Sequence, residues 1–459
     1  MINWRKPLLK TLLALSGNDM VRRFQEMKEL CRLPADEIRK HQEERLKKIL
    51  QHAFSRVPYY KRILGDAKVV NSNGAVQLEN WNSIPFLTKD IIRHEFDSLL
   101  SDDSDKRHSY PNTSGGSTGE PVKFIQDREY KLRDMAGTLF FFDLAGKDLG
   151  EPEIKLWGSQ RDVFEGTLGI KEKIQNFLYN RVFLNSFNMD ARILPEYIRK
   201  WNAFKPKAIW TYVSSIYELA RYIEKNSIEI HPPHTVICTS GTLTPEIRKY
   251  LERILKTRVF NQYGSREVGA IATECGRGHG LHILSWKQYL EVVDTDGKPC
   301  PAGKEGEIVI TNLDNYSMPL IRFRIGDTGI LGECDHSCGL NMPVLQQVTG
   351  RLTDHFRRRD GSMFHGQYFA FLFYFTPWVK KFQFVQENYD LVRVYIVPAG
   401  EKDQEKLDFV EQKIKLVLGE NCSVDFVFVD DIPPSGSGKF LYTVSKVDPS
   451  EPKEQAGTK

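Results

Sequence analysis

The chain has 459 residues with 64 basic and 60 acidic side chains, for a net charge of +4, and 41% of its residues are hydrophobic. This length predicts two or three domains, and the near balance of charge, without a basic tract interleaved with aromatic residues, argues against a nucleic-acid-binding protein. The sequence has no apolar run near the roughly 20 residues that span a bilayer, and its seven cysteines do not indicate a secreted disulfide framework. We therefore expect a cytoplasmic protein.

The N-terminal segment carries a short apolar run that superficially resembles a signal peptide. Arg5 and Lys6 precede the run, but Lys10 interrupts it and no clear cleavage site follows. We expect an amphipathic helix that either packs on the body of the protein or rests on a membrane surface. Glu, Lys, Arg and Leu continue at helical spacing through 18–65, which predicts a helical segment over 1–65.

Residues 112–124, with the sequence NTSGGSTGEPVKF, are the most informative stretch of the chain. Glycine lets backbone N–H groups approach a phosphate closely, and the Ser and Thr hydroxyl groups can donate to its oxygens. The stretch is not a Walker A loop, because Glu-Pro follows Gly119 in place of Lys-Ser or Lys-Thr. Taken alone, it fits a flexible Ser/Gly linker as well as a phosphate-binding loop.

Strands and helices alternate after this loop. The predicted strands share a short apolar, β-rich composition and lie at 122–125, 208–213, 235–239 and 258–262. The predicted helices share apolar residues at a spacing of three or four and begin near Leu132, Ile216 and Pro245. Such alternation predicts an α/β architecture with buried strands.

The pattern becomes β-rich between Tyr289 and Thr311, and it changes again after Gly350. There a hairpin, a helix and a strand between 381 and 429 predict a small ββαβ domain. We therefore predict a large α/β domain over 1–349, a small mobile α+β domain over 350–446 and a disordered tail over 447–459.

Two further segments suit nucleotide chemistry, although each also has an ordinary interpretation. Tyr263-Gly264-Ser265-Arg266-Glu267 follows a predicted strand, where a turn could present an aromatic ring and a carboxylate; a turn with a core tyrosine is the alternative. Gly326-Asp327 sets an acid at the end of an apolar strand, where it could accept hydrogen bonds from a ribose diol or cap a turn.

Two more segments involve the predicted small domain. Gly350-Arg351 lies at the expected domain boundary, where a linker would act as a hinge. Residues 434–439, PSGSGK, form a glycine-rich loop whose Lys439 could reach a phosphate, although such a loop is often only a connection.

The order of these five motifs resembles the adenylate-forming superfamily of acyl-CoA synthetases over roughly residues 45–445. The segments 57–60, 240–248 and 280–283, with the sequences VPYY, SGTLTPEIR and GLHI, resemble the phenylacetate-CoA ligase-like branch, including its capsule-biosynthesis, CapK-type members. The resemblance implies that a carboxylate attacks the α-phosphate of ATP to give an acyl-adenylate and pyrophosphate. A thiol or another nucleophile then displaces AMP, so ATP/AMP, Mg²⁺ and coenzyme A are implied.

Motif matching implies a role for each site residue. The phosphates would be held by one loop, Thr113, Ser114, Gly115, Gly116, Ser117, Thr118 and Gly119. Tyr263 would lie along the adenine and Asp327 and Arg351 would hold the ribose hydroxyls, while the rest of the nucleotide site would be lined by Ser240, Gly241, Thr242 and Gly264. Glu267 would bind Mg²⁺, and Lys439 would assist adenylation until rotation of the small domain removes it.

The sequence departs from the superfamily pattern in two places. Many members carry a lysine directly after the loop proline, where this chain has Val122 followed by Lys123. An acidic pair is common after the Gly-Arg hinge, where this chain has Thr353 before Asp354. The hinge residue therefore stays open, whereas retention of Lys439 and Glu267 argues against an inactive enzyme.

Cysteine and histidine residues cluster in two segments, Cys275, His279 and His282 in the first and Cys334, His336 and Cys338 in the second. Brought together by the fold, they would supply a tetrahedral, structural zinc site. We choose as ligands Cys275, His282, Cys334 and Cys338, with His279 and His336 as substitutes. Zinc-containing members of the resembled branch support this choice, and unrelated thiols and surface histidines are the alternative.

The predicted function is ATP-dependent activation of a carboxylic acid, followed by transfer to coenzyme A. The main alternative is transfer to an amine or hydroxyl acceptor in surface-polysaccharide biosynthesis, and the second is a non-catalytic nucleotide- or zinc-binding protein. The acid is not identified by the sequence, since Trp157 and Tyr212 suit a pocket wall and core packing equally. A homodimer is a further expectation.

Overall fold

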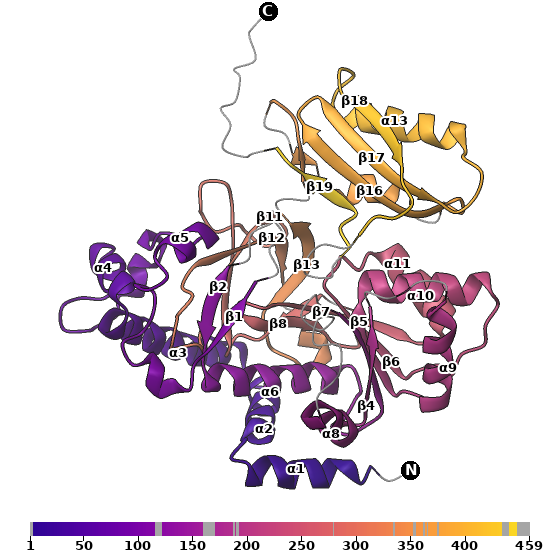
Figure 1. Cartoon of the computed structure of the whole chain (residues 1–459). Coiled ribbons are helices and arrows are strands. Elements are labelled where there is room, and N and C mark those ends of the chain that lie inside the picture. The colour runs from indigo at the N-terminus through magenta and orange to yellow at the C-terminus, as the bar shows by residue number, and fades with distance from the viewer. Residues whose placement is uncertain are drawn as a thin grey trace, which may run out of the picture. The chain divides into compact units, whose positions relative to one another are not determined.

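The structure is a computed structural model that describes residues 3–114, 122–158, 170–186, 189, 192–278, 280–333, 336–351, 355–360, 363–364, 366–373, 376–433 and 440–447. The described residues divide into two compact units (Figure 1). The larger unit draws on 1–325 and 329–348, and the smaller unit on 326–328, 349–435 and 439–459. The predicted tail beyond residue 447 lies outside the described residues.

The larger unit begins with four helices, α1 (Arg5–Leu15), α2 (Met20–Leu30), α3 (Ala35–Arg56) and α4 (Pro58–Asp66). Pro34 precedes α3, and Pro58 opens α4 at its first position, where a missing N–H costs nothing. Leu50 and Tyr60 from these helices enter the core of the β-rich half together with Ile310. Short elements follow: η1 (Leu78–Ser83), α5 (Lys89–His94) and η2 (Ser104–Arg107).

An eleven-stranded sheet organises the larger unit. In spatial order its strands are β10 (Gln288–Val293), β11 (Glu305–Asn312), β12 (Phe323–Gly332), β13 (Val344–Arg351), β9 (Leu281–Ile283), β8 (Gly269–Glu274), β7 (Arg258–Ser265), β6 (Thr235–Thr239), β5 (Ala208–Tyr212), β3 (Glu153–Trp157) and β4 (Arg181–Asn185). Strand β7 pairs parallel with β6 and antiparallel with β8. It therefore joins a parallel half to an antiparallel half.

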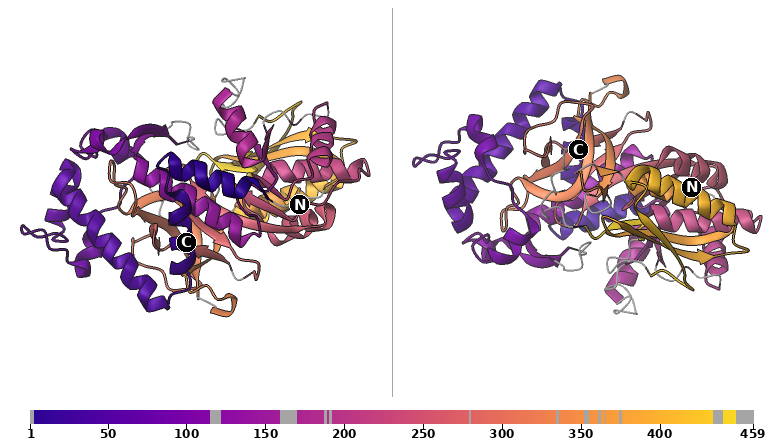
Figure 2. Two further views of the ribbon diagram at one scale, coloured as in Figure 1. Left: turned by 90° about the horizontal axis from the view of Figure 1, so that it is seen from below. Right: turned by 90° about the horizontal axis from the view of Figure 1, so that it is seen from above.

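Helices cover the parallel half on both faces, as buried parallel strands require. They are α6 (Arg128–Leu144), α8 (Ile170–Tyr179), α9 (Leu194–Phe204), α10 (Val213–Lys225) and α11 (Pro245–Leu255). Phe142 of α6 packs with Trp210 and Ile237 on one face, and right-handed crossovers place α9, α10 and α11 on the other. Helices α9–α11 lie at the opposite end of this unit from α3 and α4 (Figures 1 and 2). The predicted α/β fold class is confirmed.

The predicted strand–helix alternation from 208 to 262 matches the elements closely, with one correction. Strand β7 does not end at Gln262 but continues through Tyr263 and Gly264 to Ser265, because these residues pair with β8. A Cβ atom on Gly264 would lie 2.8 Å from the carbonyl oxygen of Gly269, so glycine permits this close pairing. The expected turn is thus confined to 266–268.

The glycine-rich stretch lies in a separate hairpin of β1 (Tyr110–Thr113) and β2 (Lys123–Gln126), paired antiparallel. Just beyond the paired residues, the backbone N–H of Ser114 donates to the Val122 carbonyl at 2.8 Å. Residues 115–121, which include the predicted glycines, lie outside the described residues. The short helix η3 (His336–Cys338) precedes β13.

The smaller unit contains a four-stranded sheet of order β18-β17-β16-β19. Its elements are β14 (Phe356–Arg357), β15 (Met363–Phe364), α12 (Gly366–Phe371), β16 (Val379–Asn388), β17 (Leu391–Pro398), α13 (Gln404–Leu418), β18 (Ser423–Phe428) and β19 (Thr443–Ser445). The β16–β17 hairpin is antiparallel, whereas β18 and β19 add in parallel on either side. This sheet contains the predicted ββαβ unit and one strand more.

Candidate active site

Two of the predicted nucleotide-binding segments follow neighbouring parallel strands, whose carboxyl ends lie at the same edge of the sheet. Residues 240–242 come directly after β6, which pairs with β7 as far as Cys238 opposite Asn261, and Tyr263 lies two residues further along β7. Ser240 has φ +56°, a left-handed conformation that serine adopts only where its surroundings impose it. The carboxyl ends of parallel strands are where α/β sheets bind ligands, so this edge is the candidate nucleotide site.

The turn after β7 is fixed by buried side chains that hold three successive carbonyl groups. Gln126 Nε2 donates to the carbonyl oxygens of Arg266 at 2.8 Å and Glu267 at 3.3 Å. The Val268 carbonyl accepts from Lys287 Nζ at 3.1 Å and from Gln288 Nε2 at 2.6 Å. Glu267 itself is 8% exposed, and these hydrogen bonds hold the backbone of its turn in place.

Tyr263 is 9% exposed, so most of its surface packs in the core of the β-rich half. The sequence left open whether this residue is a core tyrosine or a nucleotide contact. The structure shows that it is a core tyrosine, and the nucleotide contact stays a prediction. Tyr263 lies near the carboxyl end of β7, the strand that pairs parallel with β6.

Thr113 and Ser114 lie where the hairpin enters the predicted phosphate loop. Ser114 is 6% exposed, and its Oγ accepts a hydrogen bond from the Val122 N–H at 2.9 Å. A hydroxyl that accepts in this way keeps its own hydrogen for a second partner. The hairpin therefore orients the two hydroxyl-bearing residues at the base of the loop.

Asp327 and Arg351, the predicted ribose-binding pair, both belong to the smaller unit and lie 3.4 Å apart, from Nε to Oδ1. Asp327 does not end its strand, as the sequence suggested, but lies inside β12, and Gly350-Arg351 ends β13 instead of forming a linker. Lys439 lies outside the described residues, as does the Thr353-Asp354 pair.

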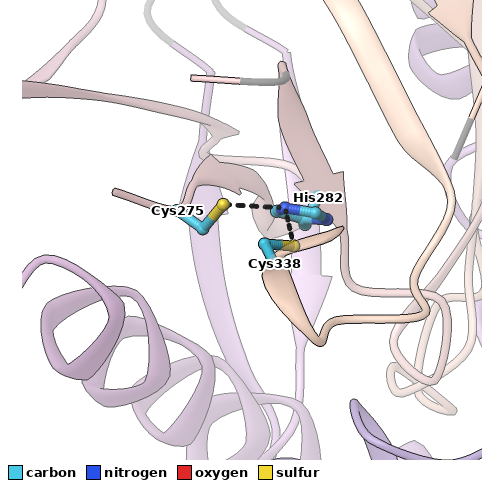
Figure 3. A group of neighbouring side chains, drawn as sticks. All are labelled: Cys275, His282 and Cys338. Carbon is cyan, nitrogen blue, oxygen red and sulfur yellow. Dashed lines mark hydrogen bonds between the residues drawn. The ribbon is translucent and has the colours of Figure 1, made fainter. Parts of the chain in front are cut away.

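The two Cys/His segments come together in the larger unit (Figure 3). His282 of β9 is fully buried, and its Nε2 lies 3.2 Å from Cys275 Sγ and 3.5 Å from Cys338 Sγ. The ligand atoms of these three residues lie within 4.8 Å of one another. Two thiols and an imidazole form a donor set that suits zinc. The structure does not describe Cys334 or His279, nor the side chain of His336.

A buried charged cluster beneath the turn was not predicted. Lys287 is fully buried, and its Nζ lies 3.4 Å from Asp134 Oδ1 and 3.7 Å from Asp314 Oδ2. Asp314 also pairs with Arg45 at 2.7 Å. Burial raises the pKa of the adjacent Tyr130 well above its usual range, so its hydroxyl stays neutral. A lone lysine in an apolar run, as at 284–290, is the one sequence sign of such a cluster.

Comparison with known proteins shows which proteins the chain resembles. Residues 356–446 match the family model of the CapK C-terminal domain. The chain is 25% identical to protein CapK of Staphylococcus aureus, covering 88% of this chain and 89% of the relative. It is 27% identical to phenylacetate-coenzyme A ligase of Thermus thermophilus, covering 78% of this chain and 80% of that protein.

Solved structures share the fold. A 2-hydroxyisobutyryl-CoA ligase in the postadenylation state matches 91% of this chain and 92% of its own, with a TM-score of 0.71 and 18% identity. The O-succinylbenzoate coenzyme A synthetase of Bacillus subtilis, in complex with ATP and magnesium ion, matches 72% of this chain and 68% of its own, with a TM-score of 0.51 and 14% identity. The predicted resemblance to the CapK and phenylacetate-CoA ligase branch of the adenylate-forming enzymes is confirmed.

Proposed function

We propose that this chain is an AMP-forming ligase that activates a carboxylic acid as its acyl-adenylate and passes the acyl group to coenzyme A. The observation that carries the proposal is that residues 240–242 and the Glu267 turn follow the neighbouring parallel strands β6 and β7, at their carboxyl ends. Relatives that are phenylacetate-coenzyme A ligases, together with the shared ligase fold, support thiol transfer as the second step.

The residues divide the chemistry between them. The loop that begins at Thr113 would donate to the phosphates, and the Glu267 carboxylate would hold Mg²⁺. Such an ion would supply positive charge to offset the negative charge of the phosphates. Asp327 and Arg351 hold the ribose hydroxyls by motif matching, and Lys439 stabilises the developing charge at the α-phosphate.

Carboxylate-dependent exchange of pyrophosphate into ATP tests the first step. A panel of aryl, fatty and amino acids identifies the substrate, and Lys439→Ala abolishes the exchange that the wild type shows. Lys446→Ala, which removes an exposed lysine paired with Glu387, is the matched control and keeps full exchange. A wild-type chain that exchanges with none of these acids favours the non-catalytic alternative, whereas a Lys439→Ala variant as active as an active wild type would refute the role assigned to Lys439.

The acceptor is a second question, because the CapK relative makes transfer to an amine or hydroxyl group the competing proposal. Adding coenzyme A to the active mixture and measuring thioester by mass spectrometry separates the two. Consumption of the adenylate by an amino sugar, with no thioester formed from coenzyme A, would establish the alternative acceptor.

We also propose a structural zinc ion at Cys275, His282 and Cys338, with Cys334 as the fourth ligand. The support is the donor set and the 4.8 Å limit on the separations of its three described members. Because four protein ligands leave no open position, such a zinc ion would clamp β9 and η3 to the end of β8 without entering the reaction.

The N-terminal helix carries a third proposal, contact with a membrane surface from the cytoplasm. Leu9 of α1 is buried, whereas Trp4, Leu12 and Leu15 are 49%, 40% and 80% exposed. In the described part of the chain, no helix combines the length and apolar character that a bilayer span requires. Sedimentation with anionic vesicles tests this contact, and Leu15→Glu is expected to weaken it. Light scattering measures the mass of the chain in solution without vesicles and so tests the expected homodimer separately from membrane contact.

A further inference from the structure

Gln126 joins two segments of the candidate site that are distant in sequence. Its side chain is 1% exposed at the end of β2. The amide Nε2 donates to the carbonyl oxygens of Arg266 at 2.8 Å and Glu267 at 3.3 Å. The amide Oε1 accepts from Asn112 Nδ2 at 3.0 Å. One buried side chain therefore contacts both the glycine-loop hairpin and the Glu267 turn.

The contact continues into the base of the loop. Asn112 precedes Thr113 in β1, and its Oδ1 accepts the Thr113 N–H at 2.9 Å. A chain of hydrogen bonds thus runs from Thr113 through Asn112 and Gln126 to the backbone of Glu267. Hydrogen bonds in a chain polarise and so strengthen one another, and at Gln126 burial also limits competition from water.

The far side of the turn is held independently of this chain. The Val268 carbonyl is bound by Lys287 and Gln288, and the Ala270 N–H donates to Asp134 Oδ1 at 2.7 Å. Removing the Gln126 amide therefore leaves these bonds in place. What it removes is the connection between the turn and the hairpin.

We propose that Gln126 is a positioning residue that holds Thr113 and Ser114, at the end of the β1 strand, at a fixed spacing from the turn that carries Glu267. This inference rests on the proposed function. A metal ion that binds both a carboxylate and a phosphate requires a fixed distance between the two groups. Mutation of residues that orient metal ligands without touching the metal typically changes metal affinity about 10- to 100-fold.

The test measures ATP binding by calorimetry with the full chain, with and without Mg²⁺. The variant Gln126→Met keeps the length of the side chain but removes its amide, and Gln126→Glu keeps the acceptor for Asn112 but removes the donor to the turn. We expect both to bind Mg²⁺-free ATP as the wild type does and to lose about tenfold or more of the affinity gained with Mg²⁺. Glu267→Gln, which removes the proposed Mg²⁺ ligand, shows the affinity that is measured when the Mg²⁺ effect is lost completely.

Gln383→Met is the matched control, since Gln383 Nε2 also donates to a carbonyl, that of Leu441 at 2.8 Å, but in the smaller unit. If Gln126→Met does not fold, Asn112→Ala cuts the same chain at its other end and is expected to weaken the Mg²⁺ effect as well. An unchanged Mg²⁺ effect in the folded variants overturns the inference and leaves the proposed function standing. A wild-type chain that binds no MgATP overturns both.

Discussion

The guanidinium group of Arg351 lies 3.4 Å from the carboxylate of Asp327, and on the same two strands the hydroxyl oxygens of Thr328 and Thr349 lie 2.7 Å apart. Strands β12 and β13 are neighbours in the sheet, so the two predicted ribose-binding residues are presented side by side. An arginine that pairs with a carboxylate fixes the orientation of that carboxylate.

Asp327→Asn is expected to weaken AMP binding about 10- to 100-fold, because hydrogen bonds to a charged acceptor contribute about 1.5–3 kcal/mol each. Calorimetric titration with AMP measures this loss. Asp425→Asn, which removes a carboxylate that is 53% exposed in the same unit, is the control and should leave AMP affinity unchanged. Equal affinities in wild type and Asp327→Asn would refute the ribose assignment.

The wild-type chain is expected to purify with one zinc ion, and Cys275→Ser to purify without it and unfold at a lower temperature. Serine keeps the size of the side chain but removes the thiolate ligand. Elemental analysis and thermal unfolding measure the two effects. Cys422→Ser removes a buried thiol of the smaller unit and should keep the zinc. A metal-free wild type would end the proposal.

Glu153→Gln is expected to lower the free energy of unfolding of the larger unit by about 3–5 kcal/mol, the usual cost of leaving a buried charge without its partner. Glu153 pairs with Lys147, which is 4% exposed, and with Arg181 at 2.7 Å. Denaturant titration measures the change. Asp143→Asn breaks the half-exposed pair with Lys28 and should cost less than about 1 kcal/mol.

The same carboxyl group predicts an acid dependence of stability. Burial opposes the ionisation of Glu153, but Lys147 and Arg181 outweigh burial and lower its pKa from 4.5 to about 2. Glu153 stays ionised in the folded chain where the unfolded chain has taken up a proton, so its contribution is complete above pH 4.5 and is lost as the pH falls towards 2. The stability difference between wild type and Glu153→Gln should therefore shrink over this window; a constant difference would contradict the assignment.

Gly269→Ala is expected to destabilise the protein strongly and to reduce exchange activity. Gly269 has φ +73°, and a Cβ atom there would lie 1.9 Å from Asp134 Oδ1, the acceptor that fixes Ala270. Gly74→Ala is the control that distinguishes backbone strain from steric overlap. Gly74 has φ +81°, but no atom lies within 4 Å of the added carbon. The control should cost about 1 kcal/mol, the strain of the backbone alone. A similar loss of stability in both variants would mean that steric overlap with Asp134 does not contribute at Gly269.

Much of the parallel half was predictable from sequence because its signals are local. The strand at 235–239 and the helix that Pro245 opens match β6 and α11, since an apolar run and a helix-starting proline act within a few residues. The antiparallel half was predictable only as β-rich. Asp327 inside β12 and Arg351 at the end of β13 depend on pairing between strands, which no window of sequence records.

Some residues of the candidate site were likewise predictable from the sequence and others were not. Tyr263, Glu267 and Ser240 were predicted because motif order marks them. Gln126 and Lys287 were not, because an amide or an ammonium group becomes meaningful only when the carbonyl that it contacts is known. His282 and Cys338 are an intermediate case, in which residue type suggested a common site and only the fold could bring the two segments together.

Strand β8 runs from Gly269, at the turn that carries Glu267, to Glu274, one residue before Cys275. Both of its ends are fixed, one by Asp134 and the other by the proximity of Cys275 to His282. One inserted residue would turn every later side chain of β8 to the opposite face and withdraw the thiol from the imidazole. We therefore expect homologues that keep both sites to hold the length of this strand constant.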